Sequence, residues 1–152
     1  MTELDGMPGH LIRRLQQIAV AVFHAETAVY GYDLTPVQYA ALRAVQEHPG
    51  IDQGTLAGLI AYDRTTIAGV VDRLVKKGLL SREVNQADRR AREVRITEIG
   101  CEAIEAMREG VERAQLKMIE ALSPTEANEL IRLLQKVTTE GNELSRAPQR
   151  AP

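Results

Sequence analysis

The sequence contains few of the residues that build disulfide frameworks, metal clusters and aromatic stacking surfaces. Its 152 residues include one cysteine, three histidines and no tryptophan, and aromatic residues make up 3%. One cysteine cannot form an intrachain disulfide, and three histidines make a structural zinc site hard to assemble. The few aromatic rings also argue against a stacking platform for single-stranded nucleic acid. We therefore expect no metal ion and no cofactor, and duplex DNA is the better candidate for a nucleic-acid partner.

Long apolar runs, an export signal and catalytic motifs are missing as well. No apolar stretch approaches the roughly 20 residues that cross a bilayer. Residues 1–6 contain acids and lack a basic region followed by an apolar one. Neither a Gly-rich phosphate loop nor a Ser-His-Asp or Cys-His set is present. The sequence therefore predicts a cytoplasmic protein that has no contact with membranes and is not an enzyme.

The charge of the chain is small in total but unevenly distributed. From Asp63 to Arg95 the chain carries nine cationic and five acidic side chains, a net charge of +4, so with a total of −2 the remainder carries −6. A basic module between acidic segments is expected when that module faces a polyanion. A solvated, mixed-charge surface is the alternative interpretation.

Helical periodicity and capping patterns recur along the chain, and one segment has the alternation of strands. Leu80, Arg82 and Val84 alternate, as do Val94 and Ile96, with polar residues 85–91 between them, which predicts a two-stranded hairpin. The proline-containing residues from Ala147 onward are predicted to be disordered. The expected helices run from about Pro8 to Tyr30, from Pro36 to His48, from Asp52 to Ile60, from Asp63 to Gly78, from Thr97 through Leu122, and from Ser123 through Val137.

The order of these elements predicts a mainly α fold with a small β-wing. Residues 35–97 would form a winged helix-turn-helix, with the paired helices joined by a short turn at residues 61–63. The helix after Thr97 is too long to serve only this small core. Residues 1–34 and 98–152 would therefore form a separate helical region.

The helix after Asp63 has two faces of different chemistry. Its apolar residues, Ile67, Val70, Val71 and Leu74, would point inward. Short hydroxyl side chains and a glycine would let the outer face approach base edges, and arginines could reach guanine or phosphate. The start of the preceding helix could add phosphate contacts. An ordinary amphipathic helix with a solvated face is the alternative. The predicted DNA contacts here are Arg64, Thr65, Thr66, Gly69, Arg73, Lys76, Gln53 and Thr55.

The tip of the predicted hairpin is rich in arginine. Arg89, Arg90 and Arg92 lie at or beside it, and a narrow minor groove attracts guanidinium groups. Asp88 is expected to pair with a nearby arginine and to hold the loop in shape. As a bare charge run the tip would be a solvated turn, but its position after a recognition-type helix favours DNA binding.

From residue 9 to 144 the chain resembles the MarR family of winged-helix transcriptional regulators. The resemblance implies an obligate homodimer joined by the terminal helices, residues 1–34 and 98–152. It also implies recognition helices in successive major grooves of a pseudo-palindromic operator, wings in minor grooves with Arg90 inserted, and repression released by a small ligand. The motifs that carry it are Leu34–Tyr39 (LTPVQY), Asp63–Ile67 (DRTTI), Asp72–Leu79 (DRLVKKGL), Asp88–Arg90 (DRR) and Val94–Thr97 (VRIT).

The segment Gly9–Gln17 (GHLIRRLQQ) resembles regulators of aromatic-acid catabolism, including the protocatechuate-responsive kind. This resemblance implies that Arg13 grips the carboxylate of a small aromatic effector, a task for which a guanidinium is well shaped. His10, Tyr39 and His24 are further candidates for lining the site. A second ligand-binding histidine expected in the protocatechuate branch is replaced by Ala19, so a related hydroxylated aromatic or heteroaromatic acid fits as well. Surface pairing of Arg13 and Arg14 with acids is the alternative.

Two other functions are compatible with parts of the sequence. Some regulators of this type sense peroxide through a cysteine, and Cys101 is the available thiol. Its place early in the long helix, near Ile99 and Ile104, is more typical of a buried, inert thiol. A winged helix used for protein–protein contacts is the second alternative, although such a module needs neither the basic segment nor arginines at the hairpin tip.

Overall fold

Side-chain caps begin every helix from α2 to α6 in the computed structural model, which describes residues 1–152. Each capping side chain accepts a hydrogen bond from a backbone N–H in the first turn, which satisfies a donor that the helix itself leaves free. Thr35 and Ser123 form reciprocal capping boxes with Gln38 and Glu126. The capping residues are Thr35, Asp52, Asp63, Thr97 and Ser123.

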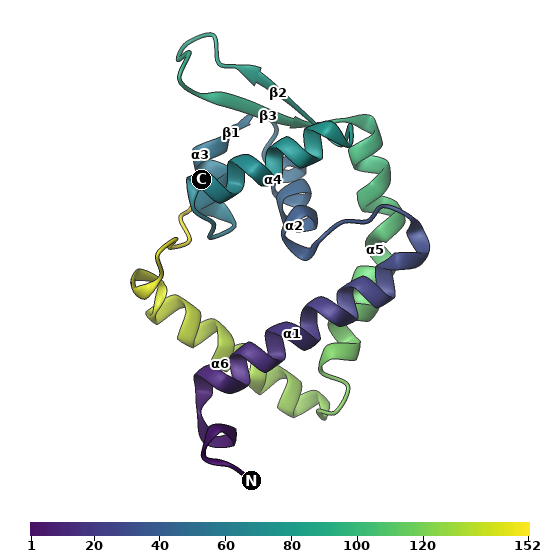
Figure 1. Ribbon diagram of the computed structural model, residues 1–152, viewed down its shortest axis with the longest axis vertical. Helices are drawn as coiled ribbons and strands as arrows, with labels where there is room; N and C mark the ends of the chain where they lie inside the picture. The colour runs from purple at the N-terminus through teal and green to yellow at the C-terminus, as the bar shows by residue number, and fades with distance from the viewer.

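The predicted fold class is confirmed: the chain is mainly helical with a small antiparallel sheet (Figure 1). The elements, in chain order, are η1 (Glu3–Gly6), α1 (Pro8–Thr27), η2 (Ala28–Tyr30), α2 (Pro36–Glu47), β1 (Ile51–Asp52), α3 (Gln53–Leu59), α4 (Arg64–Lys76), β2 (Leu80–Val84), β3 (Arg92–Ile96), α5 (Glu98–Met118), α6 (Pro124–Glu140) and η3 (Asn142–Leu144).

The sheet has three strands in the order β1-β3-β2, so the prediction of a two-stranded hairpin was incomplete. β2 and β3 form the predicted hairpin, with Leu80 opposite Ile96 at the base of the wing, and Ile51 pairs with Val94 on the other side of β3. β1 has only two residues, which is too short for alternation to show in the sequence. This extra strand attaches the start of α3 to the wing.

A single hydrophobic core holds α2, α3, α4 and the sheet together, and it extends into α1 and α5. We call α2, α3, α4 and the sheet the lobe. Its buried side chains include Leu42, Leu56 and Leu74 from the three helices. Phe23 of α1 and Met107 of α5 join the same core. The two long helices α1 and α5 therefore pack against the lobe that carries the wing.

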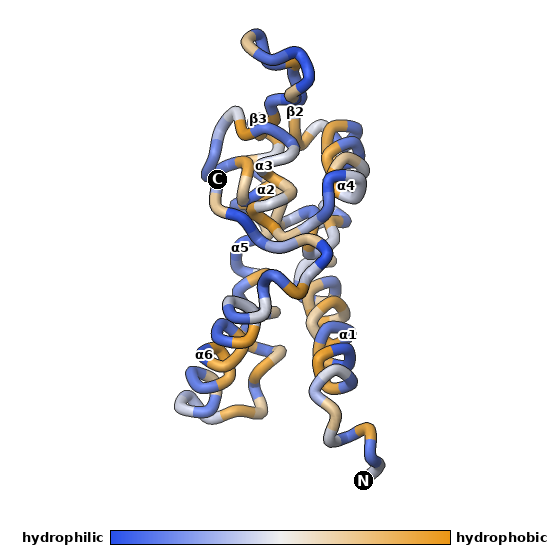
Figure 2. The backbone as a smooth tube through the Cα atoms, turned by 90° about the vertical axis from the view of Figure 1, so that its left-hand side faces the viewer, coloured by the Kyte–Doolittle hydropathy of each residue, from blue (hydrophilic) through white to orange (hydrophobic).

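The lower part of the molecule is open. Figure 2 shows α1 and α6 as two separate helices below the lobe, each with hydrophobic residues recurring along it. None of the residues of α6 is buried, although Ile131, Leu133, Leu134 and Val137 are large and apolar.

None of the helices combines the length and the apolarity that a membrane crossing requires.

Two boundary expectations were wrong. α5 ends at Met118, so Leu122 lies in the turn before α6 rather than on the helical stripe. The C-terminal residues are ordered instead of disordered: the backbone N–H of Arg150 donates to the carbonyl of Gly58 over 2.7 Å. This contact joins segments far apart in the sequence, so local composition could not reveal it.

Candidate nucleic-acid interface and effector cleft

The two faces of α4 are separated as the spacing predicted. Ile67, Val70, Val71 and Leu74 are buried in the core. The polar residues of the opposite face, Arg64, Thr65, Thr66, Arg73 and Lys76, are exposed. A Cβ added at Gly69 would meet no atom within 4 Å, so space is open along the middle of this face. α4 thus presents short side chains at its N-terminal half and cations at both ends.

The N-terminus of α4 is fixed by Asp63. Its Oδ1 accepts the backbone N–H of Thr66 over 2.8 Å. Hydrogen bonds from the backbone and side chain of Thr66 hold the pKa of the Asp63 carboxyl below its usual value, and the nearby positive charge of Arg146 adds to this. The cap thus engages the Thr66 hydroxyl, while Thr65 is exposed in the same turn of α4.

The wing tip is held by side-chain hydrogen bonds to its own backbone. Asn85 Oδ1 accepts the N–H groups of Ala87 and Asp88 over 2.8 and 3.0 Å. Asp88 Oδ1 accepts the N–H of Arg90 over 3.0 Å. Asp88 was expected to pair with an arginine side chain. This expectation was wrong, because the carboxylate accepts a hydrogen bond from the backbone N–H of Arg90 instead. Asp88 nevertheless holds the loop in shape, as expected, and the Arg90 side chain is exposed.

A hollow of about 350 Å³ lies between the wing tip and the starts of α3 and α4. Three guanidinium groups line it, and the carboxylates of Asp52 and Asp88 contribute the opposite charge. The exposed cations outnumber the acids on this wall, which favours an anionic partner. The lining arginines are Arg64, Arg90 and Arg92, whereas Arg89 lies on the other side of the tip beside Val84, Asn85 and Gln86.

The two predicted contacts on α3 differ in their availability. Thr55 donates its hydroxyl hydrogen to Asp52 Oδ2 over 2.6 Å, so this group is already used within the cap. Burial works against ionisation of Asp52, but hydrogen bonds from Thr55 and Gly54 bring its pKa below the usual value. Gln53 Oε1 accepts a hydrogen bond from Arg82 over 3.2 Å, which leaves its amide N–H groups free to donate.

A second, smaller cavity of about 130 Å³ lies between α1, α5 and the start of α2. Apolar side chains such as Val20, Phe23 and Met118 line it, together with the amides of Gln16 and Gln115. Apolar walls with a few polar groups are the composition of small-molecule sites. We call this cavity the candidate effector cleft. It was missed in the sequence because its walls come from helices about 90 residues apart.

The predicted ligand residues fall into two groups near this cleft. Arg13 lies one helical turn before Gln16, and its guanidinium contacts His10 Nδ1 at 3.2 Å and Gln17 Oε1 at 3.4 Å. It pairs with no acid, whereas Arg14 lies 3.9 Å from Asp5. The expected convergence of all four residues on one cavity is not found.

The other two predicted ligand residues flank a ring in the wall of the cleft. The ring of Phe23 has His24 and Tyr39 edge-on at centroid distances of 5.9 and 6.0 Å. Burial raises the pKa of the Tyr39 hydroxyl, so it stays a neutral hydrogen-bond donor. His24 is exposed, which places it beside the cleft wall and in solvent.

Cys101 lies in the first turn of α5 and is half-buried. Its backbone N–H donates to Thr97 in the helix cap. The apolar side chain of Ile104 is buried one turn further along the helix. Nothing in this geometry favours a redox role over a structural one.

Comparison with known proteins gives consistent relatives. The MarR family model matches residues 32–91. A putative transcriptional regulatory protein for the hcr operon of Thauera aromatica is 31% identical over 139 residues, which cover 90% of this chain and 84% of the relative.

Two solved structures are similar over nearly their whole length. The PcaV transcriptional regulator from Streptomyces coelicolor, in complex with its natural ligand, has a TM-score of 0.83 at 31% identity, covering 91% of this chain and 96% of that chain. Bordetella bronchiseptica BpsR, whose structure concerns regulation of DNA binding by 6-hydroxynicotinic acid, has a TM-score of 0.82 at 28% identity, covering 91% and 97%.

Proposed function

The chain belongs to the MarR family of transcriptional regulators, and we propose that it is a dimeric repressor released from double-stranded DNA by a small aromatic carboxylate. The observation that carries this proposal is the outward face of α4, which is exposed and has open space at Gly69, beside a wing tip with three exposed arginines. The proposal has three parts: how DNA is read, how two copies join, and where the effector binds.

DNA is read by α4 and the wing, which both belong to the winged helix-turn-helix of residues 35–97. The methyl and hydroxyl groups of Thr65 and Thr66 suit base edges in a major groove, and the space at Gly69 allows close approach. Arg64, Arg73 and Lys76 reach guanine or phosphate, and Gln53 donates to phosphate. Arg90 enters a minor groove with Arg89 and Arg92 nearby, because guanidinium groups are attracted by its negative potential. Thr55 contributes least, since its hydroxyl hydrogen is engaged by Asp52.

Two copies join through residues 1–34 and 98–152. α6 exposes an apolar face and buries none of its own residues, so the isolated chain gives this helix little reason to be stable. Leu11 and Ile12 on α1 are exposed as well. Burial of such area against a second copy is favourable at about 25 cal/mol per Å² of apolar surface. A symmetric dimer then presents two α4 helices to a pseudo-palindromic operator.

The effector binds at the cleft between α1 and α5. An aromatic ring fits the apolar wall around Phe23, and the guanidinium of Arg13 supplies a bidentate partner for the carboxylate. His10 steadies Arg13, and Tyr39 and His24 support the Phe23 ring. The similar BpsR is regulated by 6-hydroxynicotinic acid, an aromatic acid of this kind. Because the cleft lies between the helical region and the lobe, binding there can shift the dimer away from its DNA-binding arrangement.

Selection of duplexes from a random library by the purified protein tests the proposal. We expect enrichment of a pseudo-palindrome with half-sites about 10 bp apart, or a multiple of this. Aromatic carboxylates that raise the melting temperature of the protein should also release the selected duplex. Failure to enrich any duplex contradicts the DNA-binding part. Enrichment without release by any stabilising carboxylate contradicts the effector part.

A further inference from the structure

The residues after η3 run back from α6 to the lobe that carries the wing. Figure 1 shows this segment crossing from the end of α6 to the neighbourhood of α3, so that α5, α6 and the lobe enclose a ring. We call residues Ser145–Arg150 the strap. Without it, α6 would be joined to the lobe only through the length of α5.

The strap attaches to the lobe at the end of α3. The backbone N–H of Arg150 donates to the carbonyl of Gly58 over 2.7 Å, and Gln149 Nε2 donates to the carbonyl of Leu59 over 2.9 Å. These are the last two carbonyls of α3, where a helix runs out of partners of its own. The fit is close, because a Cβ at Gly58 would lie 3.0 Å from Arg150 Cβ.

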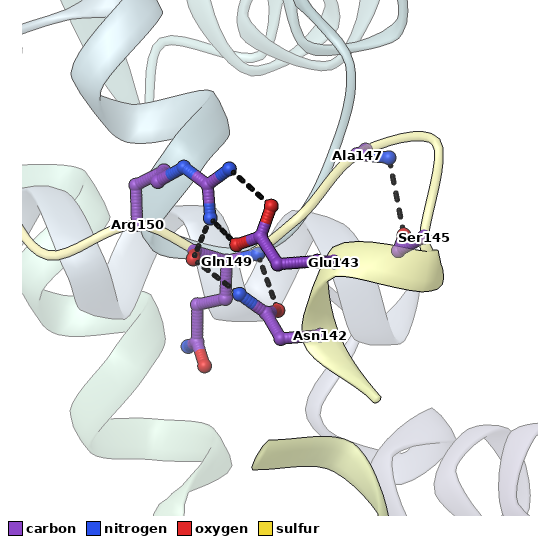
Figure 3. A network of polar contacts seen from close by, with 6 residues as sticks. All are labelled: Asn142, Glu143, Ser145, Ala147, Gln149 and Arg150. Atoms are coloured by element: carbon purple, nitrogen blue, oxygen red, sulfur yellow. Dashed lines mark hydrogen bonds and ion pairs between the residues drawn. The ribbon is translucent and has the colours of Figure 1, made fainter. Parts of the chain in front are cut away.

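The same end of the strap is also tied to η3, directly after α6 (Figure 3). The side chain of Asn142 makes two hydrogen bonds to the backbone of Gln149, its Nδ2 donating to the carbonyl over 3.0 Å and its Oδ1 accepting the N–H over 2.9 Å. Arg150 donates two hydrogen bonds to the Glu143 carboxylate over 2.6 and 3.1 Å. Gln149 and Arg150 thus bond to η3 and to α3 at the same time, and so join the end of α6 to the lobe.

The place of attachment adjoins the start of α4. A cavity of about 380 Å³ is shared between Ser145, Arg146 and Ala147 of the strap and the turn of residues 61–63, together with Thr66. Asp63, the cap of α4, lies on this wall, and Arg146 is close enough to lower its pKa. A displacement of the strap therefore acts on the turn from which α4 begins.

We propose that the strap fixes the lobe relative to α6 and so sets the separation of the two α4 helices in the dimer. This inference rests on the proposed function, in which α6 belongs to the dimer interface and α4 reads DNA. With α6 joined to the lobe through the strap as well as through α5, the lobe samples fewer orientations relative to α6. A rigid dimer then discriminates sharply between operators whose half-sites differ in spacing, because only one separation matches the two α4 helices.

The test compares the full-length chain with two strap variants on duplexes from the selection experiment. Asn142→Ala combined with Gln149→Ala removes the Asn142–Gln149 bonds to η3 and the Gln149–Leu59 bond to α3. Arg150→Pro independently removes the N–H given to Gly58 and the ion pair with Glu143. Gln46→Ala on α2 is the matched control, and Arg146→Ala removes only the charge. Affinity is measured by fluorescence anisotropy on the selected duplex and on duplexes with one base pair inserted or deleted between the half-sites.

Both strap variants should remain dimers in sedimentation and bind the selected duplex about tenfold more weakly, as expected if a tenth of the population keeps the competent arrangement. They should also lose most of the discrimination between spacings. Wild-type affinity and wild-type discrimination between spacings in both variants would overturn the proposal. If Arg146→Ala alone reproduces the whole loss of affinity and discrimination, the loss comes from the charge of Arg146 and not from the attachment of the strap. That result also overturns the proposal. If the unaltered protein binds no duplex, the proposed function fails and the strap fails with it.

Discussion

Arg82 of β2 and Asp72 of α4 form an ion pair with Nη1 and Oδ1 2.5 Å apart, and the same nitrogen lies 3.2 Å from Gln53 Oε1 of α3. One side chain of the wing thus contacts both helices of the helix-turn-helix. Half of the Asp72 side chain is exposed, so the pair contributes little to stability. Its effect is on the position of the wing relative to α4.

Arg82→Ala should therefore weaken operator binding while changing the free energy of unfolding by less than about 1 kcal/mol. Asp72→Asn should weaken binding by less, because Arg82 keeps its contact with Gln53. The double variant should lose no more affinity than Arg82→Ala alone, because the Asp72 interaction is already absent from that variant. Anisotropy and urea denaturation measure the two quantities. Arg43→Ala, which breaks the exposed pair with Glu47, is the control. Additive losses of affinity would contradict the coupling.

Gly69→Ala separates stability from DNA binding. The new methyl group meets nothing within 4 Å in the protein, and alanine is favoured over glycine inside a helix by about 0.8–1 kcal/mol. We expect a higher free energy of unfolding together with weaker operator binding, because the methyl intrudes on the DNA-facing side. Gly110→Ala is the contrast, since its Cβ would lie 2.5 Å from Tyr30 Cε2 and should destabilise the fold. Unchanged operator affinity in Gly69→Ala would remove this face from the interface.

The Asp63 cap should give a pH-dependent contribution to stability. Hydrogen bonds from Thr66 lower its folded-state pKa below 3.8, so the stabilisation is present above the unfolded value and is lost as the pH falls through the folded one. An asparagine in its place would cap the helix at every pH, because its amide oxygen does not titrate. The difference in free energy of unfolding between the wild type and Asp63→Asn should be constant from pH 7 to about 5. Below pH 3.8 the wild type should lose stability relative to Asp63→Asn. A difference that stays constant throughout would contradict the pKa assignment.

Arg13→Ala should leave operator affinity intact and blunt release by aromatic carboxylates. Its guanidinium is exposed and pairs with no acid, so folding does not depend on it. Loss of a bidentate charged contact of this kind costs about 1.5–3 kcal/mol of effector binding, which titration calorimetry would detect. Arg14→Ala is the neighbouring control, since Arg14 faces Asp5. An unchanged effector concentration for release would show that the carboxylate binds elsewhere.

The sequence predicted those features that depend on near neighbours. The caps at Thr35 and Asp63 lie within three residues of the groups they bind, and the inward and outward faces of α4 follow from helical spacing alone. For the same reason the hairpin between residues 80 and 96 was visible as alternation.

Features that depend on distant segments were not visible in the sequence. β1 exists because Ile51 pairs with Val94, and the strap is ordered because Arg150 finds Gly58. The candidate effector cleft likewise needs Phe23 and Met118 to meet across two helices. Asp88 was assigned a side-chain partner because composition shows nearby arginines but not the backbone N–H that the loop brings closer.

The central claim, that α4 and the wing hold duplex DNA, is tested most directly by operator affinity across a salt series for the wild type, Arg90→Ala and the control Arg108→Ala. For the wild type, we expect log affinity to fall linearly with log salt, with a slope of about −0.9 for each phosphate neutralised. Arg90→Ala should bind about 1–3 kcal/mol more weakly without loss of the dimer, and Arg108→Ala should match the wild type. Wild-type affinity in Arg90→Ala, or an affinity that does not respond to salt, would contradict the claim.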